Sequence, residues 1–318
     1  MTQPERTRAS MHTAYITHPL CRKHEAGLSH PECPERLAAI DDRLHAAHLY
    51  DYLYHFHHPA QATREQLVRV HDAAYVDRIF EIAPAAGVIQ LDPDTGMNPH
   101  SLGAALHAAG AAIEAVDKVI TGQVQNAFCA VRPPGHHAGR ASAGGFCIFN
   151  NVACAAAHAL EVHDLARVAI VDFDVHHGNG TEEIFRDDPR VLFVSTFQHP
   201  FYPHCGADSS SADIVNIPLP AGTSGEVYRE AFAIRALPAL EAQRPEMIFL
   251  SAGFDGHRED DMAHFNLLEA DYAWITEQVM AVARAHAADR IVSVLEGGYN
   301  LNALGRSAAA HIRALAGL

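Results

Sequence analysis

The sequence predicts an α/β fold, in which helices cover both faces of a parallel sheet. Strand-like and helix-like segments alternate through most of the chain, which is the pattern of parallel strands joined by crossover helices. The chain has 318 residues, of which 48% are hydrophobic, enough for the core of one large domain or of two. No internal repeat and no linker-like stretch divides it, so a single domain is the economical interpretation.

In the first half of the chain, the pattern predicts a strand at 14–17 and helices at 34–49, 73–82 and 101–121. Pro34 suits the first turn of the first helix. That helix repeats apolar residues at helical spacing, namely Leu37, Ile40 and Leu44. Thr63 and Gln66 predict a capping box, and Asp72 predicts a helix cap. Gly122 ends the long alanine-rich helix as a residue suited to a left-handed turn.

In the second half the alternation is stricter. Strands are predicted at 127–131, 167–173, 191–196, 247–251 and 291–295. Helices are predicted at 151–162, 181–186, 224–242, 269–288 and 303–316. Pro238 predicts a kink in the helix at 224–242, or its early end.

A polar loop follows each of these five strands. The loops have the sequences RPPGHHAGRASAGGFC, DVHHGNG, FQHPFYP, AGFDGHRED and EGGYNL. In open α/β sheets the chemistry lies beyond the carboxyl ends of the strands. The five loops therefore predict one functional site at that edge of the sheet.

Asp174 and His176 are the centre of a predicted metal site. Residues i and i+2 of a strand point to one face, so these two side chains can bind one ion together. Asp255, in the loop after another strand, can supply a third ligand. An Asp–His–Asp set with an open position is typical of a catalytic metal, with zinc the first choice and Fe²⁺ or Co²⁺ tolerated. Asp172 is either a fourth ligand or the acceptor that orients a histidine.

Three further side chains have the chemistry of a hydrolytic site. His136 and His137 follow two prolines and a glycine, and such a rigid imidazole pair suits general acid–base work, with a surface pair as the alternative. Tyr299 can donate a hydrogen bond to a developing oxyanion, or it is an ordinary packed tyrosine. The segments 144–146 and 197–202 offer aromatic walls for an apolar chain, or they pack in the core.

Composition excludes several classes of protein. The formal net charge of −15 predicts no direct nucleic-acid binding, because DNA affinity depends on neutralising phosphates with Lys and Arg. Six cysteines without a CxxC pair fit reduced thiols. Residues 1–10 predict a flexible arm rather than a signal peptide, followed by a catalytic domain over 11–318. No stretch approaches the roughly 18 apolar residues of a membrane helix, so no membrane partner and a cytoplasmic location are expected.

Six motifs occur together in the chain, namely HPECPERL, RPPGHHA, GGFCIFNN, VDFDVHHGNGT, SAGFDGH and EGGYNL. In this order and spacing they closely resemble the histone deacetylase superfamily of metal-dependent amidohydrolases, and most of all its class II and bacterial members. The resemblance runs from about His18 to the last helix. It implies a single α/β domain with an eight-stranded parallel sheet, related to arginase.

The resemblance also implies roles for individual residues. The zinc ligands, for one ion per chain, are Asp174, His176 and Asp255. His137 matches the general base that takes a proton from water and later protonates the leaving amine. His136 matches its electrostatic partner, paired with Asp172, and Tyr299 matches the residue that polarises the scissile carbonyl.

A substrate channel and cation sites come from the same resemblance. The channel is formed by Gly145, Phe146 and an aromatic residue near Phe201. A structural potassium ion is expected at oxygens of Asp172, Asp174, His176, Ser195 and Thr196. A second cation site is expected near Phe185 and Val191. Asn179 stands where class I members have an aspartate, as in class II, which gives His137 a neutral partner.

The predicted function is zinc-dependent removal of an acyl group, typically acetyl, from an alkyl amine. An acyl-lysine peptide, an acetylated polyamine and a small amide all fit this chemistry. Polyamine-selective relatives resemble each other in an acidic gate seven residues after the last metal aspartate, where this chain has Met262, preceded by the acidic run 259–261. Met262 favours an acyl-lysine-like or a broad range of substrates, whereas the acidity of the chain favours cationic ones.

Two other functions are weighed against this prediction. A binuclear ureohydrolase of the arginase type needs a D-x-D pair, where this chain has Asp255, Gly256 and His257. A non-catalytic binding module on the same fold is expected to lose His137 or Tyr299, and both are present. Assembly into a homo-oligomer stays open.

Overall fold

A computed structural model describes residues 12–209 and 211–318, and it confirms the α/β class. The predicted arm at 1–10 lies outside the described residues. The main sheet has eight parallel strands in the order β2-β1-β5-β10-β9-β6-β7-β8. Its strands are β1 (Thr13–Ile16), β2 (Tyr54–Phe56), β5 (Asn126–Cys129), β6 (Val168–Asp172), β7 (Val191–Gln198), β8 (Ile214–Leu219), β9 (Met247–Ala252) and β10 (Ile291–Leu295). A small antiparallel pair consists of β3 (Ile89–Gln90) and β4 (Gly96–Met97).

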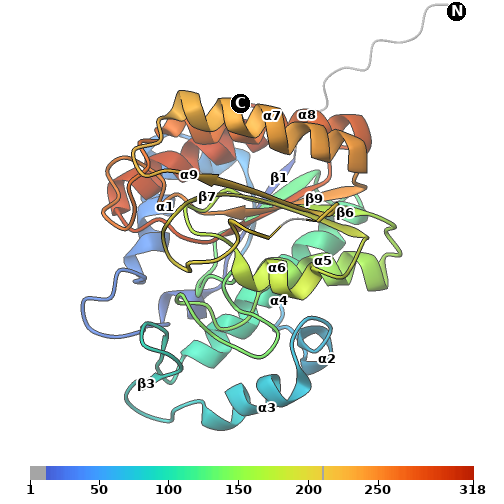
Figure 1. Cartoon of the computed structure of the whole chain (residues 1–318). Helices are drawn as coiled ribbons and strands as arrows, with labels where there is room; N and C mark the ends of the chain where they lie inside the picture. Colours follow the sequence, from blue (N-terminus) through green and yellow to red (C-terminus); the bar gives the residue numbers. More distant parts are fainter. Residues whose placement is uncertain (1–11, 210) are drawn as a thin grey trace, which may run out of the picture.

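Helices cover both faces of the sheet, as expected. They are α1 (Glu35–Ala46), α2 (Arg64–Leu67), α3 (Ala73–Ile82), α4 (Ser101–Ile120), α5 (Asn151–Val162), α6 (Asn179–Phe185), α7 (Gly225–Gln243), α8 (Glu269–His286) and α9 (Leu301–Leu315), with 3₁₀ turns at Pro19–Arg22 and Tyr50–Tyr52. Figure 1 shows α7, α8 and α9 on one face and α4, α5 and α6 on the other. Among these, α9 packs against both α1 and α8, and α5 packs against α4.

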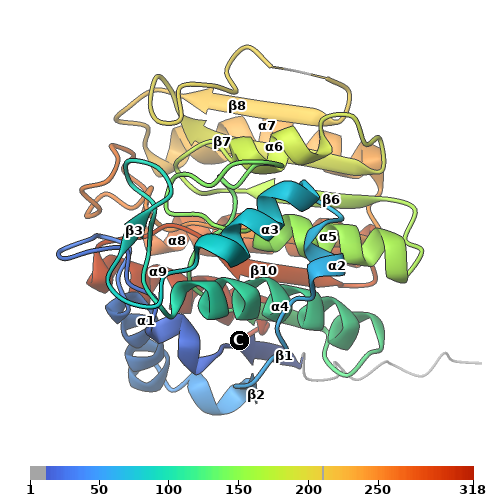
Figure 2. The same ribbon diagram turned by 90° about the horizontal axis from the view of Figure 1, so that it is seen from below.

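The central strands are apolar along their length because helices bury both of their faces. Every residue of β6 and of β9 is buried. The two strands of the main sheet that the sequence pattern did not locate, β2 and β8, lie at the two edges of that sheet (Figure 2). β2 has only three residues and is partly exposed, and β8 contains Pro218, which an edge strand tolerates.

The local helix signals are confirmed with two differences. Thr63 and Gln66 form the capping box, and Gly122 has a φ of 74° just beyond the end of α4. Asp72 occupies the cap position of α3, but its side chain makes no capping hydrogen bond. For α7, the sequence predicts that Pro238 either kinks the helix or ends it early. The early end is wrong, because α7 continues past Pro238 to Gln243. Its buried face, Tyr228, Phe232, Ala236 and Leu240, keeps its spacing of four on both sides of the proline, so packing holds the helix together.

Among the described residues, no helix is both long enough and apolar enough to cross a membrane.

Gly110 is the point where another chain segment crosses α4 closely. The Ala62 N–H donates to the Leu106 carbonyl at 2.9 Å, and a methyl group on Gly110 would overlap the Ala60 carbonyl oxygen. Alanine in a helix interior is normally more stable than glycine by roughly 0.5–1 kcal/mol. We expect Gly110→Ala to do the opposite and to destabilise the fold by about 1–3 kcal/mol, because the overlap is with backbone. Thermal unfolding measures the change.

Gly103→Ala in the same helix is the matched control. Its new methyl group would meet only the Leu20 side chain, with Cδ1 at 3.2 Å, and that side chain can move. The two substitutions should therefore change Tm in clearly different ways. An unchanged Tm in Gly110→Ala would contradict this account of the crossing.

Candidate active site

The predicted site residues come together at the carboxyl edge of the sheet. Strands β5, β10, β9 and β6 are neighbours and run in parallel, so the loops that follow them begin side by side. These loops carry His136 and His137 after β5, Asp174 and His176 after β6, Asp255 after β9 and Tyr299 after β10. The loop after β7 adds Phe201 and Tyr202.

Asp174, His176 and Asp255 form a buried group with the geometry of a metal site. His176 Nδ1 lies 3.1 Å from Asp174 Oδ1 and 3.1 Å from Asp255 Oδ2. One ligand atom from each residue lies within 4.8 Å of the other two. Burial and the neighbouring charge of Asp174 raise the pKa of Asp255 to about 6. Two repelling carboxylates and an imidazole with this spacing fit a divalent transition metal.

Backbone N–H groups hold the two carboxylates in place. Asp174 accepts from the N–H of His176 at 2.9 Å and from the N–H of Gly297 at 2.8 Å. Asp255 accepts from the N–H of Val175 at 3.0 Å. A Cβ atom on Gly297 would overlap both carboxylates, so glycine is needed where the loop after β10 passes the group.

The two histidines after β5 have opposite electrostatic environments. His136 Nδ1 lies 2.9 Å from Asp172 Oδ2. Burial lowers the pKa of His136, but the charges of Asp172 and Asp174 outweigh it and raise that pKa well above its usual range. Burial, and then the positive charge of His136, hold the pKa of His137 well below its usual range. The pair therefore combines a cationic imidazole with a neutral one. The centres of the two rings lie 4.0 Å apart.

Asn179 fixes the proton on His137. Its Oδ1 lies 2.7 Å from His137 Nδ1 and can only accept, so Nδ1 carries the proton. The lone pair of neutral His137 is then on Nε2, which makes Nε2 a proton acceptor. His137 therefore has the neutral partner, Asn179, that the sequence predicts in place of the aspartate of class I members.

Tyr299 and three other aromatic rings surround this chemistry. The Tyr299 ring packs edge-on against Phe146 at 5.6 Å. Burial and the charge of Asp255 hold the pKa of the Tyr299 hydroxyl well above its usual range, so it keeps its proton. Phe201 stacks on the His176 ring, with ring centres 5.5 Å apart. Tyr202 lies edge-on to His137, with ring centres 5.2 Å apart. Both aromatic residues of this loop thus contact the site.

The other residues predicted to line the substrate channel differ in how closely they approach the site. Gly145 lies against the ring of His137, where a Cβ atom would overlap it. Met262 is half-buried, and its N–H donates to Asp260 Oδ1 at 3.0 Å. Phe197 is buried against His177, with ring centres 4.6 Å apart. Its ring therefore packs in the core, the alternative that the sequence left open.

Asp260 has a role that the sequence did not reveal. This buried carboxylate accepts hydrogen bonds from the N–H groups of Tyr299 at 2.6 Å, Asn300 at 2.9 Å and Met262 at 3.0 Å. It therefore ties the loop of Asp255 to the loop of Tyr299. The acidic run 259–261 is not a uniform charged edge, because Glu259 pairs with Arg306 at 2.8 Å and Asp260 points inward.

Arg36, within the HPECPERL motif, holds the backbone of the loop after β10 by hydrogen bonds. Its fully buried guanidinium donates to the carbonyls of Gly298 at 2.6 Å and Glu296 at 2.5 Å. It also lies 5.0 Å from the centre of the Tyr299 ring. Glu32 neutralises Arg36 at 3.1 Å and also pairs with Arg132.

Comparison with known proteins decides the family. The model of the histone deacetylase domain matches residues 30–315. The chain belongs to the histone deacetylase family. The histone deacetylase-like amidohydrolase of Pseudomonas aeruginosa is 36% identical over 314 residues, which cover 91% of this chain and 82% of that protein. Human polyamine deacetylase HDAC10 is 37% identical over 309 residues, covering 90% of this chain but 45% of that protein.

A solved structure agrees. The crystal structure of the HDA15 HD domain superimposes with a TM-score of 0.91 at 35% identity, covering 96% of this chain and 90% of that one. The single-domain fold with its eight-stranded parallel sheet is thereby confirmed as that of the histone deacetylases. The protein is a deacetylase, and its family is metal-dependent. This favours the deacetylase over the ureohydrolase and the binding module.

We expect Asp260→Asn to lower kcat by about 10–100-fold with little change in KM, because a misplacement of roughly 1 Å at a reacting group has effects of this size. An asparagine offers only one acceptor oxygen, so at least one of the three N–H groups faces an NH₂ group instead. Steady-state kinetics on an acetylated amine measure both constants.

Asp261→Asn is the matched control, since it removes the same charge from the exposed neighbouring position. It should leave kcat and KM near the wild-type values. If Asp260→Asn lowers only Tm and leaves kcat intact, Asp260 is a structural residue and does not position Tyr299.

Proposed function

We propose that this chain is a zinc-dependent deacetylase that removes an acetyl group from an alkyl amine, with acyl-lysine peptides as its preferred substrates. The observation that supports it best is the buried Asp174–His176–Asp255 group beside a neutral histidine, His137. A metal-ligand set alone could be structural. A proton acceptor and a protonated tyrosine hydroxyl beside it are what amide hydrolysis requires.

Asp174, His176 and Asp255 would hold the ion, one per chain, and Fe²⁺ or Co²⁺ would be tolerated by the same ligands. A bound zinc supplies a Lewis acid for the scissile carbonyl and lowers the pKa of a coordinated water. Two aspartates and one histidine leave a coordination position for substrate or water, as in other catalytic sites.

The protein residues then carry the proton transfers. His137 Nε2 takes a proton from the attacking water and afterwards gives it to the leaving amine. The Tyr299 hydroxyl donates a hydrogen bond to the carbonyl oxygen as negative charge develops there. His136, made cationic by Asp172, stabilises the same negative charge through space. Catalysis thus depends on one neutral and one charged imidazole in contact.

The substrate channel in this proposal is lined by Gly145, Phe146, Phe201 and Tyr202. Their rings and backbone surround the metal group and suit the apolar stem of a lysine. Met262 stands where an acidic gate would select polyamines. The inward orientation of Asp260 and the pairing of Glu259 with Arg306 remove two neighbouring carboxylates from that role. An acetylated polyamine or small amide is the second candidate, favoured by the similarity to a polyamine deacetylase.

The deciding experiment compares kcat/KM of the zinc-loaded protein on an acetyl-lysine peptide and on N-acetylputrescine. We expect the peptide to be the better substrate by at least about tenfold, which corresponds to about 1.4 kcal/mol of transition-state binding. A preference for N-acetylputrescine would overturn the substrate assignment and leave the deacetylase chemistry intact.

Tyr299→Phe tests the assigned mechanism. Loss of the hydroxyl should lower kcat by about 10²–10³-fold, the usual effect of removing one oxyanion donor. The ring contact with Phe146 is kept, so Tm should stay close to that of the wild type. A loss of activity under about threefold would remove Tyr299 from the mechanism.

We also propose a structural potassium ion between the end of β6 and the middle of β7. The hydroxyl oxygens of Ser195 and Thr196 are buried without a hydrogen-bond partner, and Ser195 pairs with Asp172 across the two strands. An unpartnered buried hydroxyl is costly unless a cation or water completes it. Oxygens of Asp172, Asp174, His176, Ser195 and Thr196 would hold the ion. The second cation site near Phe185 and Val191 stays a prediction.

Potassium chloride should raise the Tm of the wild type above its value in tetramethylammonium chloride of equal ionic strength, because the ion binds only the folded state. Ser195→Ala should reduce this difference. Ser293→Ala is the control, since that buried hydroxyl already bonds to His311 at 2.8 Å. An equal potassium effect in the wild type and Ser195→Ala would contradict the site.

A further inference from the structure

A second group of metal-ligating side chains lies near the amino ends of the strands, opposite the active site. Asp117 is near the end of α4, His158 is in the last turns of α5, and His163 directly follows α5. The chain then enters β6 at Val168, so the group lies near the amino ends of the strands, away from the active site. Among the described residues, only this group and the active-site group bring three such ligand atoms together.

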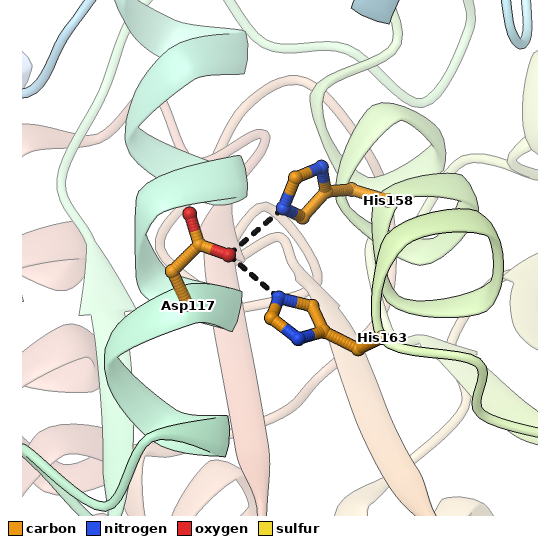
Figure 3. Close-up of side chains that lie close together, drawn as sticks. All are labelled: Asp117, His158 and His163. Atoms are coloured by element: carbon orange, nitrogen blue, oxygen red, sulfur yellow. Dashed lines mark hydrogen bonds and ion pairs between the residues drawn. The ribbon is translucent and has the colours of Figure 1, made fainter.

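Both imidazoles point at one carboxylate oxygen (Figure 3). His158 Nε2 lies 2.9 Å and His163 Nε2 2.6 Å from Asp117 Oδ1. The three ligand atoms lie within 4.8 Å of one another. The side chains of His158 and His163 are 7% and 19% exposed, whereas that of Asp117 is 48% exposed. The histidines are thus held in place by packing, and the carboxylate side is accessible to an ion from solvent.

We propose that Asp117, His158 and His163 bind a Zn²⁺ ion or a similar transition-metal ion. Two imidazoles and one carboxylate form a three-residue ligand set that leaves a position for water. Imidazole selects zinc and its neighbours over calcium or magnesium. Because Asp117 is on α4 and both histidines belong to α5 and its end, the ion clamps these two helices together. This site is independent of the deacetylase mechanism.

Arg69 determines how tightly this site binds. Its Nη1 lies 3.2 Å from His158 Nδ1 and can only donate, so without metal the proton of His158 is on Nε2, facing Asp117. Metal binding to Nε2 moves that proton to Nδ1, where it faces the guanidinium. Arg69 is partly exposed, and its nearest carboxylate, Glu65, is 3.8 Å away, so the side chain can turn aside. The arginine therefore weakens metal binding without preventing it.

Zinc titration of the full-length chain against a chromophoric chelator tests the proposal. The wild type should bind one equivalent more than Asp117→Asn, which keeps an acceptor oxygen for the two imidazoles and so preserves the contact between helices. His163→Gln should lose the same equivalent. Deacetylase activity should be unchanged in both variants. Equal zinc stoichiometry in the wild type and Asp117→Asn would overturn the proposal and leave a hydrogen-bonded contact only.

Two further variants sharpen the result. Arg69→Gln offers an acceptor to the proton on His158 Nδ1 and should tighten zinc binding at this site by about tenfold, as outer-shell partners of ligating histidines do. His286→Gln is the matched control, because His286 forms a similar bond with Glu241 at 2.6 Å but belongs to no three-ligand group in the part of the chain that the structure describes. It should bind as much zinc as the wild type. Weaker binding in Arg69→Gln would contradict coordination through Nε2.

Discussion

The structure depends on the burial of three carboxylates, Asp172, Asp174 and Asp255, in one small volume at the ends of β6 and β9. Each is at most 1% exposed. Buried carboxylates are unfavourable unless charges and hydrogen bonds compensate them. Here His136 compensates Asp172, and backbone N–H groups bond to all three. Two of the carboxylates still face each other across His176 with more negative charge than the protein neutralises. That excess is what suits this place to a divalent cation.

The same kind of bond joins the separate loops into one site. Asp174 accepts from the loop after β10, Asp255 from the loop after β6, and Asp260 from the residues at the start of α9. Glu296 accepts from the N–H groups of Gly135 and His136, at 2.6 and 3.1 Å. Hydrogen bonds to ionised acceptors are stronger and shorter than neutral ones. Residues from four strands are thereby held rigidly, which is the preorganisation that hydrolysis needs.

The sequence was sufficient for the parts of the site that follow from strand geometry. Asp174, His176 and Asp255 meet because the loops that carry them follow parallel strands that end at the same edge. The alternation of side chains along a strand does not explain the pair, because β6 ends at Asp172 and both residues lie in the loop beyond it. A hydrogen bond from the His176 N–H to Asp174 holds the two together instead. Asp260 could not be found this way, because nothing local distinguishes it from the acidic residues on either side. Its burial depends on where α9 begins, which is a tertiary contact. The strands β2 and β8 were missed for a related reason: edge strands are short or carry proline, so they lack the apolar run that identifies a central strand.

The two metal-ligating groups differ in how much they need a metal. The active-site group has two buried carboxylates to one histidine, so its charge is unbalanced without a cation. The group on α4 and α5 has one half-exposed carboxylate, and two imidazole N–H groups already satisfy it. In the first group one imidazole lies between two buried carboxylates, whereas in the second two imidazoles share one carboxylate oxygen. We therefore expect the active-site group to hold its ion more tightly than the proposed site on α4 and α5, whose occupancy would follow the metal concentration around the protein.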